Sequence, residues 1–222
     1  MTPLVKICGL STAATLETAL TAGADMVGFV FFSKSPRHVG YETARALGAR
    51  ARGRARIVAL SVDAPDDALD RIVEALEPDM LQLHGRESPE RVRAIGERYA
   101  RPTMKAIGVA ALQDFAGTHA YENAADFLLI DAKPPKNAIL PGGNGLAFDW
   151  TLASRFRPKR PWLMSGGLDP DNVAEAIALS SARGVDVSSG VERAPGEKDE
   201  ERIKAFVAAA RSAFARAAEG VP

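Results

Sequence analysis

Leu4-Val5-Lys6-Ile7-Cys8-Gly9-Leu10 lies near the beginning of the chain and has the pattern of a buried β-strand that ends in a turn. Branched aliphatic residues bounded by Pro3 and Gly9 are typical of a strand in a parallel sheet. Because side chains alternate between the two faces of a strand, Lys6 and Cys8 point in the same direction. The stretch therefore predicts a strand that carries an ammonium group and, at its carboxyl end, the only cysteine of the chain.

The composition is that of an ordinary globular protein. The 222 residues are 46% hydrophobic and 25% charged, which fits a single domain over residues 1–222. A formal net charge of zero gives no general attraction to nucleic acid or to a membrane surface, so we expect neither as a partner. The chain has no apolar run long enough to span a bilayer. One cysteine fits a reducing, cytoplasmic location, and the three dispersed histidines predict no structural zinc.

Strand patterns and helix patterns alternate along the whole chain. Further strands are expected over residues 26–31, 57–62, 80–85, 103–107, 126–131, 162–167 and 185–190. Helices are expected after Ser11 as N-cap, over 41–50 and 66–76, after Ser88, over 111–119, after Asp169, and over 199–217. Eight such units without a linker predict an α/β fold, a single-domain (β/α)8 TIM barrel with eight parallel strands.

In such a barrel, the catalytic groups lie where the strands end at the carboxyl rim. Cys8 ends the first strand, beside Lys6, whose charge favours the thiolate. Asp131 ends the sixth strand after four apolar residues, and a carboxyl group kept protonated there can serve as a general acid. The alternatives are a cysteine that is only packed and an aspartate that only caps a loop. Lys6 and Lys105 are expected to pair with Asp131 or Asp186 inside the barrel, and His84 is expected to be a hydrogen-bonded wall residue.

Small residues end the last two expected strands, where barrel enzymes often hold a phosphate group. Gly166-Gly167 and Ser189-Gly190 can direct backbone amides at an anion. Glycine pairs also form ordinary turns, but two pairs on adjacent strands favour phosphate binding. The loop over residues 132–147 is long for this position and rich in glycine and proline, which predicts a lid over the site.

Seven motifs in order along the chain resemble those of phosphoribosylanthranilate isomerase of tryptophan biosynthesis. They are Lys6-Ile7-Cys8-Gly9-Leu10, Ser35-Pro36-Arg37, Gln82-Leu83-His84-Gly85, Leu129-Ile130-Asp131, Gly142-Gly143-x-Gly145 with Phe148-Asp149-Trp150, Ser165-Gly166-Gly167-Leu168, and Asp186 to Glu192. They extend from the first strand to the last. One departure is Asn144, where the family usually has threonine or serine.

The resemblance implies an isomerase that converts the aminoaldose N-(5-phosphoribosyl)anthranilate into the aminoketose 1-(2-carboxyphenylamino)-1-deoxy-D-ribulose 5-phosphate. It implies Cys8 as the general base and Asp131 as the general acid. Arg37 would bind the anthranilate carboxylate, and the amides around Gly166, Gly167, Ser189 and Gly190 would hold the phosphate. No cofactor and no metal are implied, and the chain is expected to be a monomer or a homodimer.

Two alternatives are weighed against this function. The first is a related phosphosugar barrel, such as the aminoaldose–ketose isomerase of the histidine pathway, which has an aspartate at the position of Cys8. The second is a non-catalytic barrel that only binds ligands carrying phosphate. Cys8 argues against the first, and intact Cys8, Arg37 and Asp131 argue against the second.

Overall fold

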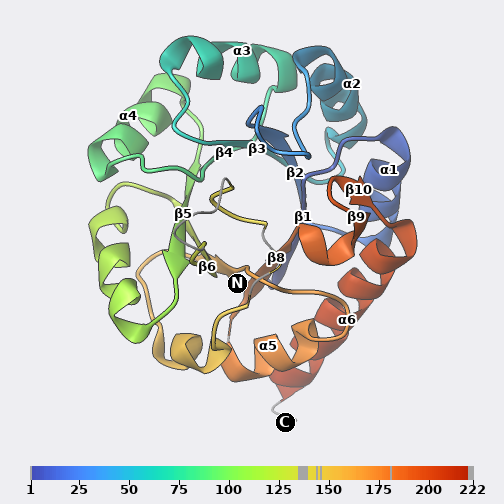
Figure 1. The fold of residues 1–222 in the computed structure, drawn as a ribbon, viewed down its shortest axis with the longest axis vertical. Helices are drawn as coiled ribbons and strands as arrows, with labels where there is room; N and C mark the ends of the chain where they lie inside the picture. Colours follow the sequence, from blue (N-terminus) through green and yellow to red (C-terminus); the bar gives the residue numbers. More distant parts are fainter. Residues whose placement is uncertain (1, 135–139, 144, 146, 181, 220–222) are drawn as a thin grey trace.

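Eight parallel strands form a closed barrel in the computed structural model, which describes residues 2–134, 140–143, 145, 147–180 and 182–219. The strands follow one another around the ring in chain order (Figure 1). They are β1 (Leu4–Cys8), β2 (Met26–Phe31), β3 (Arg56–Ser61), β4 (Met80–Leu83), β5 (Thr103–Val109), β6 (Phe127–Ala132), β7 (Trp162–Met164) and β8 (Gly184–Val187). The predicted (β/α)8 fold is confirmed.

Helices surround the barrel in Figure 1. The α-helices are α1 (Ala13–Ala22), α2 (Tyr41–Ala51), α3 (Asp66–Leu76), α4 (Pro89–Tyr99), α5 (Val173–Ser180) and α6 (Glu200–Glu219). The 3-10 helices are η1 (Leu112–Tyr121), η2 (Trp150–Arg155) and η3 (Ser189–Val191). A two-stranded hairpin, β9 (Glu192–Ala194) with β10 (Glu197–Lys198), follows η3 and precedes α6.

Several predicted boundaries were wrong. Thr12, rather than Ser11, is the N-cap of α1, and its side chain accepts a hydrogen bond from the amide of Thr15. The segment expected to be a helix over 111–119 is the 3-10 helix η1, which contains Gly117 and a threonine, both weak α-helix formers. Strands β7 and β8 end before their small residues, which belong to the turns that follow.

Successive side chains of β1 point alternately toward the surrounding helices and into the barrel. Val5 and Ile7 pack outward against the helices. Lys6 and Cys8 point inward, as predicted. The centre of the barrel is filled by a separate cluster that includes Met26, Val58, Met80, Met104, Leu129 and Leu163. Parallel strands covered on both faces in this way leave only the ends of the barrel for a binding site.

The register between β1 and β8, where the barrel closes, places Lys6 and Asp186 next to each other in the barrel interior. Strand β1 pairs with β8 so that Lys6 lies opposite Asp186, and with β2 so that Cys8 lies opposite Gly28. Lys6 Nζ lies 2.7 Å from Asp186 Oδ1, and both side chains are buried. One of the two predicted aspartate partners of Lys6 is thus the actual one. The corresponding prediction for Lys105 was wrong, because its ammonium lies 2.9 Å from Glu87 Oε2.

Candidate active site

A pocket with about 780 Å³ of empty space lies at the carboxyl ends of the strands. Cys8, Arg37, Asp131, Gly166, Gly167 and Ser189 all contribute to its lining. Six of the seven site residues expected from the sequence are therefore brought together in one cavity. Gly190 is not among the lining residues.

The thiol of Cys8 lies at the floor of this pocket and is 3% exposed. A Cβ atom added at Gly28 on the adjacent strand would lie 2.9 Å from Cys8 Sγ and 3.2 Å from Lys6 Nζ. Both groups therefore occupy the space beside this glycine, where only a residue without a side chain fits. On its other side the sulfur packs against Val30 and Leu60.

Burial and charge act in opposite directions on the thiol. Burial raises the pKa of Cys8, the ammonium of Lys6 lowers it, and the carboxylate of Asp186 raises it again. The net direction is upward, because burial is the largest of these effects and the Asp186 charge adds to it. The expectation that Lys6 would favour the thiolate thus gives the right sign for that one interaction, but burial outweighs it and the resting group is a thiol.

One hydrogen bond and one close contact with a histidine hold the side chain of Asp131 near the end of β6. Its Oδ1 accepts from the amide of Ala132 at 2.9 Å, and its Oδ2 lies 3.2 Å from His84 Nε2. His84 Nδ1 in turn lies 3.2 Å from the amide nitrogen of Gln82. These contacts fix the imidazole ring between Gln82 and Asp131. His84 is a hydrogen-bonded wall residue as predicted, and it also orients the carboxyl group of Asp131.

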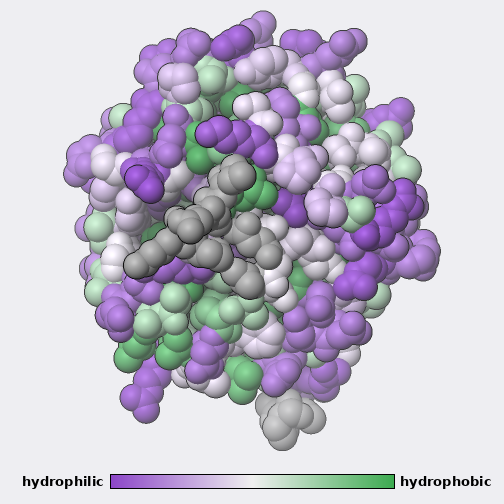
Figure 2. All heavy atoms as spheres, in the orientation of Figure 1, coloured by the Kyte–Doolittle hydropathy of each residue, from purple (hydrophilic) through white to green (hydrophobic). Residues whose placement is uncertain are grey.

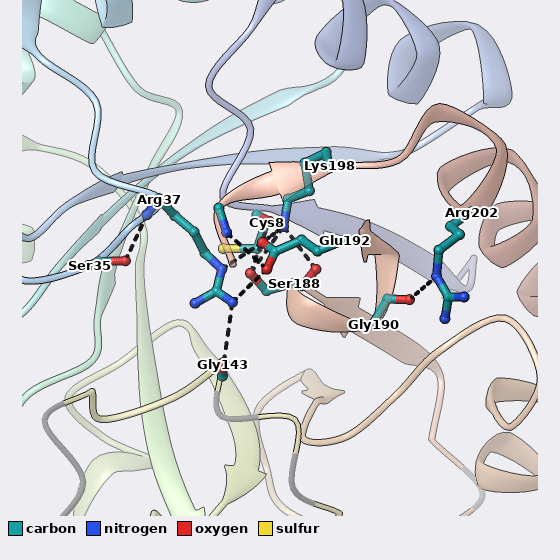
Figure 3. Close-up of polar contacts among 10 residues, drawn as sticks. Cys8, Ser35, Arg37, Gly143, Ser188, Gly190, Glu192, Lys198 and Arg202 are labelled. Carbon is teal, nitrogen blue, oxygen red and sulfur yellow. Dashed lines mark hydrogen bonds and ion pairs between the residues drawn. The ribbon is translucent and has the colours of Figure 1, made fainter. Parts of the chain in front are cut away.

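Arg37 comes from the loop after β2 and is almost fully buried. Its aliphatic stem crosses Gly9, where a Cβ atom would lie 2.8 Å from Arg37 Cδ. The guanidinium group pairs with Glu192 in a bidentate arrangement, with Nε at 2.7 Å from Oε1 and Nη2 at 2.8 Å from Oε2 (Figure 3). Glu192 was not expected as a partner of Arg37, although it lies in the last of the quoted motifs.

The turn after β7 presents unpaired backbone donors to the pocket. Gly166 and Gly167 have φ values of +88° and +66°, and their amides have no hydrogen-bond partner among the described residues. The space beside each is closed, since a Cβ atom would lie 2.5 Å from the amide nitrogen of Ala132 and 2.6 Å from that of Ala147, respectively. Free amides in such a turn are suited to bind an anion.

Gly190 has a packing role in addition to any contact through its amide. A Cβ atom there would collide with the carbonyl oxygen of Leu168, so η3 can approach the β7 turn only with glycine at this position. The carbonyl oxygen of Gly190 accepts from Arg202 Nε at 3.0 Å. The two small-residue turns therefore form one corner of the barrel rim.

Two glycines of the long β6 loop lie directly over the polar groups. A Cβ atom at Gly142 would lie 2.5 Å from Asp131 Oδ2, and one at Gly143 would lie 2.7 Å from Arg37 Nη1. The carbonyl oxygen of Gly143 accepts from Arg37 Nη2 at 3.3 Å. The predicted lid residue Asn144 and residues 135–139 and 146 lie outside the described part of the chain.

Hydrophilic residues dominate the rim of the molecular face shown in Figure 2. Within the described residues, no group of three or more His, Cys, Asp or Glu side chains is arranged to hold a metal ion. No helix in that same part of the chain is long and apolar enough to cross a membrane.

A closed parallel barrel with a partly apolar pocket at the carboxyl ends of its strands, into which a guanidinium group and free backbone amides face, is the architecture of a (β/α)8-barrel enzyme that acts on a small anionic molecule. The family model of N-(5'-phosphoribosyl)anthranilate (PRA) isomerase matches residues 5–209. The chain therefore belongs to the N-(5'-phosphoribosyl)anthranilate isomerase family.

Individual relatives agree with this family. The N-(5'-phosphoribosyl)anthranilate isomerase of Rhodopseudomonas palustris (strain HaA2) is 58% identical over 212 residues, covering 96% of this chain and 97% of the relative. The crystal structure of phosphoribosyl anthranilate isomerase from Thermotoga maritima is 35% identical, with a TM-score of 0.85 and coverage of 96% and 100%. Another solved isomerase holds reduced 1-(o-carboxyphenylamino)-1-deoxyribulose 5-phosphate and is 33% identical, with a TM-score of 0.80 and the same coverage. This chain is an isomerase of tryptophan biosynthesis that acts on N-(5'-phosphoribosyl)anthranilate.

Proposed function

We propose that Asp131 is the general acid and Cys8 the general base of the rearrangement of N-(5-phosphoribosyl)anthranilate to 1-(2-carboxyphenylamino)-1-deoxy-D-ribulose 5-phosphate. The observation that supports this assignment is their position in one pocket, at the ends of strands β6 and β1. Strands one and six are well separated on an eight-membered ring, so a sugar can lie between the two groups.

The two residues act in sequence. The Asp131 carboxyl group protonates the ring oxygen of the ribose, the C1–O bond breaks, and a protonated Schiff base forms between C1 and the anthranilate nitrogen. The thiolate of Cys8 then removes the proton from C2, and the electron pair forms the C1–C2 double bond of an enolamine. The Cys8 thiol returns a proton to C1 while the enol hydroxyl gives its proton to the Asp131 carboxylate, so the ketone forms and the thiolate and carboxyl group that began the cycle are restored. The thiolate itself arises when the resting thiol loses its proton to water before the cycle begins.

His84 supports the first step by its position. Its Nε2 lies 3.2 Å from Asp131 Oδ2, and the amide of Ala132 donates to the other oxygen, Oδ1. A carboxyl group held at both oxygens presents its proton in a defined direction, and geometric control of this kind accounts for a large part of enzymatic rate enhancement.

Anchors at both ends place the sugar between the acid and the base. We propose that Arg37 binds the anthranilate carboxylate, since a guanidinium group is suited to planar carboxylates. The apolar wall next to it, which includes Val30, Phe32, Leu60 and Val62, suits the aromatic ring. The amides of Gly166, Gly167, Ser189 and Gly190 would hold the phosphate at the opposite corner.

We further propose that the catalytic domain spans residues 1–222, needs no cofactor or metal, and acts in the cytoplasm. The single cysteine supports a reducing location. A monomer or a homodimer is expected, and light scattering on the purified chain distinguishes the two.

Turnover of freshly made N-(5-phosphoribosyl)anthranilate, followed by the loss of its fluorescence, tests the assignment. Wild-type protein should consume the substrate and Cys8→Ala should not, while both bind the reduced product analogue. The aminoaldose of the histidine pathway is the second substrate to assay. Equal turnover by Cys8→Ala would remove the thiol from the mechanism.

A further inference from the structure

Hydrogen bonds fix the orientation of the Arg37 guanidinium group. Of its nitrogens, Nε and Nη2 are both engaged by the carboxylate of Glu192, and Nη2 also donates to the carbonyl oxygen of Gly143. Among the described residues, only Nη1 has no partner. A bidentate pair fixes both the plane and the direction of the guanidinium group, so Nη1 is presented at one defined point beneath Gly143.

Glu192 is itself held by a second cation. Lys198 Nζ lies 2.7 Å from Glu192 Oε1, with 1% and 4% of the two side chains exposed. The same ammonium donates to the carbonyl oxygen of Ser188 at 2.8 Å, and the amide of Gly196 donates to Glu192 Oε2 at 3.2 Å. The hairpin β9–β10 therefore supplies both members of a buried ion pair behind Arg37 (Figure 3).

The hairpin is also connected to the end of β1. Ser188 Oγ donates to the carbonyl oxygen of Cys8 at 3.2 Å, and Lys198 Nζ lies 3.3 Å from the same hydroxyl oxygen. Continuous polar contacts thus lead from the guanidinium group of Arg37 through Glu192 and Lys198 to the backbone at Cys8. They set the position of Arg37 relative to the strand that carries the thiol.

Stability alone does not account for this cluster. Burying three charged groups costs desolvation free energy, and well-packed apolar residues often stabilise a fold as much or more. With two cations and one anion, the cluster retains one positive charge, which an anionic ligand group can neutralise. Glu192 and Lys198 do not line the pocket, so any effect on the ligand passes through Arg37.

We propose that Glu192, held by Lys198, is a positioning residue that aims Arg37 at the aromatic carboxylate of the substrate and so sets the specificity for a carboxylated ring. The proposal rests on the proposed function, in which Arg37 binds that carboxylate. Without Glu192, the guanidinium group would sample several rotamers and would lose part of its binding contribution when one is selected.

The test compares two ligands that differ only in the ring carboxylate. One is reduced 1-(o-carboxyphenylamino)-1-deoxyribulose 5-phosphate, and the other is the same compound with an unsubstituted phenylamino ring. Calorimetry gives the dissociation constant of each for every variant. The ratio is the dissociation constant of the second ligand divided by that of the first, so a high ratio means a strong carboxylate contact. The dissociation constant of the second ligand by itself reports whether the phosphate and sugar sites remain intact.

Glu192→Gln is the decisive variant because the two possible effects have opposite signs. Loss of the negative charge alone would strengthen carboxylate binding and raise the ratio, whereas loss of positioning lowers it. Rotamer freedom of a long cationic side chain predicts that the ratio falls by about 5- to 30-fold. We expect this fall with little change for the ligand that lacks the carboxylate. An unchanged or higher ratio, or equal weakening of both ligands, overturns the proposal.

Two further variants complete the design. Should Glu192→Gln not fold, Glu192→Asp keeps the charge but shortens the reach to Arg37, and a wild-type ratio there overturns the proposal as well. Glu197→Gln is the matched control, since Glu197 forms an exposed pair with Arg193 on the same hairpin, and its ratio should equal that of wild type.

Arg37→Ala separates this proposal from the proposed function. Removing a charge-assisted contact should lower the ratio about 10-fold or more. If Arg37→Ala lowers the ratio and Glu192→Gln does not, Arg37 binds the carboxylate without help from Glu192. If Arg37→Ala keeps the wild-type ratio, the carboxylate binds elsewhere, and both the role of Arg37 and the role of Glu192 are refuted.

Discussion

At Cys8, a single side chain has two requirements that conflict. Acting as a base requires the thiolate, but the position at the floor of the pocket is buried, and burial raises the pKa of the thiol. The ammonium of Lys6 beside it counteracts part of this effect. The base is therefore uncharged in the resting protein and becomes a thiolate at a cost that the ammonium of Lys6 reduces.

This conflict predicts the titration of the free enzyme. The ultraviolet absorbance of the thiolate should develop with a midpoint above the ordinary thiol pKa of 9.0. Because the chain has one cysteine, Cys8→Ala provides the baseline and no other thiol interferes. Thiolate absorbance already complete at neutral pH would show that Lys6 outweighs burial.

The carboxyl group of Asp131 is expected to be indispensable. Asp131→Asn keeps the size of the side chain but cannot supply the proton that opens the ribose ring, so kcat should fall about 100- to 10,000-fold. Fluorescence loss of the substrate measures kcat, and thermal unfolding checks that the fold is retained. A kcat near that of wild type would assign the acid to another group.

Among the elements, helix α1 begins at a cap that the sequence placed one residue too early. Thr12 has extended backbone angles, φ −127° and ψ 154°, and its hydroxyl oxygen accepts from the amide of Thr15 at 3.3 Å. Ser11 has the same chemistry but precedes this bend. Which of two adjacent hydroxyl residues caps a helix depends on where the chain leaves β1, and this is decided by Gly9 with its φ of +79°.

Adjacent alanine substitutions measure that cap. Thr12→Ala should lower the free energy of unfolding by about 0.5–2 kcal/mol, because one amide of the first turn loses its acceptor. Ser11→Ala is the matched control and should change it by less than about 0.5 kcal/mol. Urea unfolding gives both values. Equal effects of the two substitutions would contradict the assignment of the cap.

On the scale of the whole molecule, buried ion pairs tie distant parts of the barrel together. Lys6 pairs with Asp186 from the other end of the chain, and Arg37 reaches Glu192, 155 residues away. Burial raises the pKa of Glu192, but the hydrogen bonds from Arg37 and the ion pair with Lys198 outweigh this effect and leave the pKa below its ordinary value of 4.5. The ionised carboxylate therefore stabilises the folded state relative to the unfolded chain.

The pH dependence of stability follows from this sign. A carboxyl group whose pKa is lowered by folding contributes stability above its unfolded value, and the contribution is lost as the pH falls through the folded value. Wild type should be more stable than Glu192→Gln at neutral pH, and the difference should shrink below pH 4.5. Urea unfolding of both proteins across this range tests it. A difference independent of pH would mean that the charge of Glu192 contributes nothing.

Local pattern was enough to predict the order of strands and helices, the inward face of β1 and six of the pocket residues. Alternation and capping act over a few residues, and the carboxyl end of every strand in a parallel barrel faces the same rim. The partners of the buried cations, in contrast, could not be predicted from local pattern. Whether Lys105 meets Glu87 or an aspartate, and whether Arg37 meets Glu192 and Lys198, depends on how the ring closes and how the β9–β10 hairpin folds back. Periodicity states which face a side chain occupies but not which neighbour it meets there, so only the tertiary structure decided those pairs.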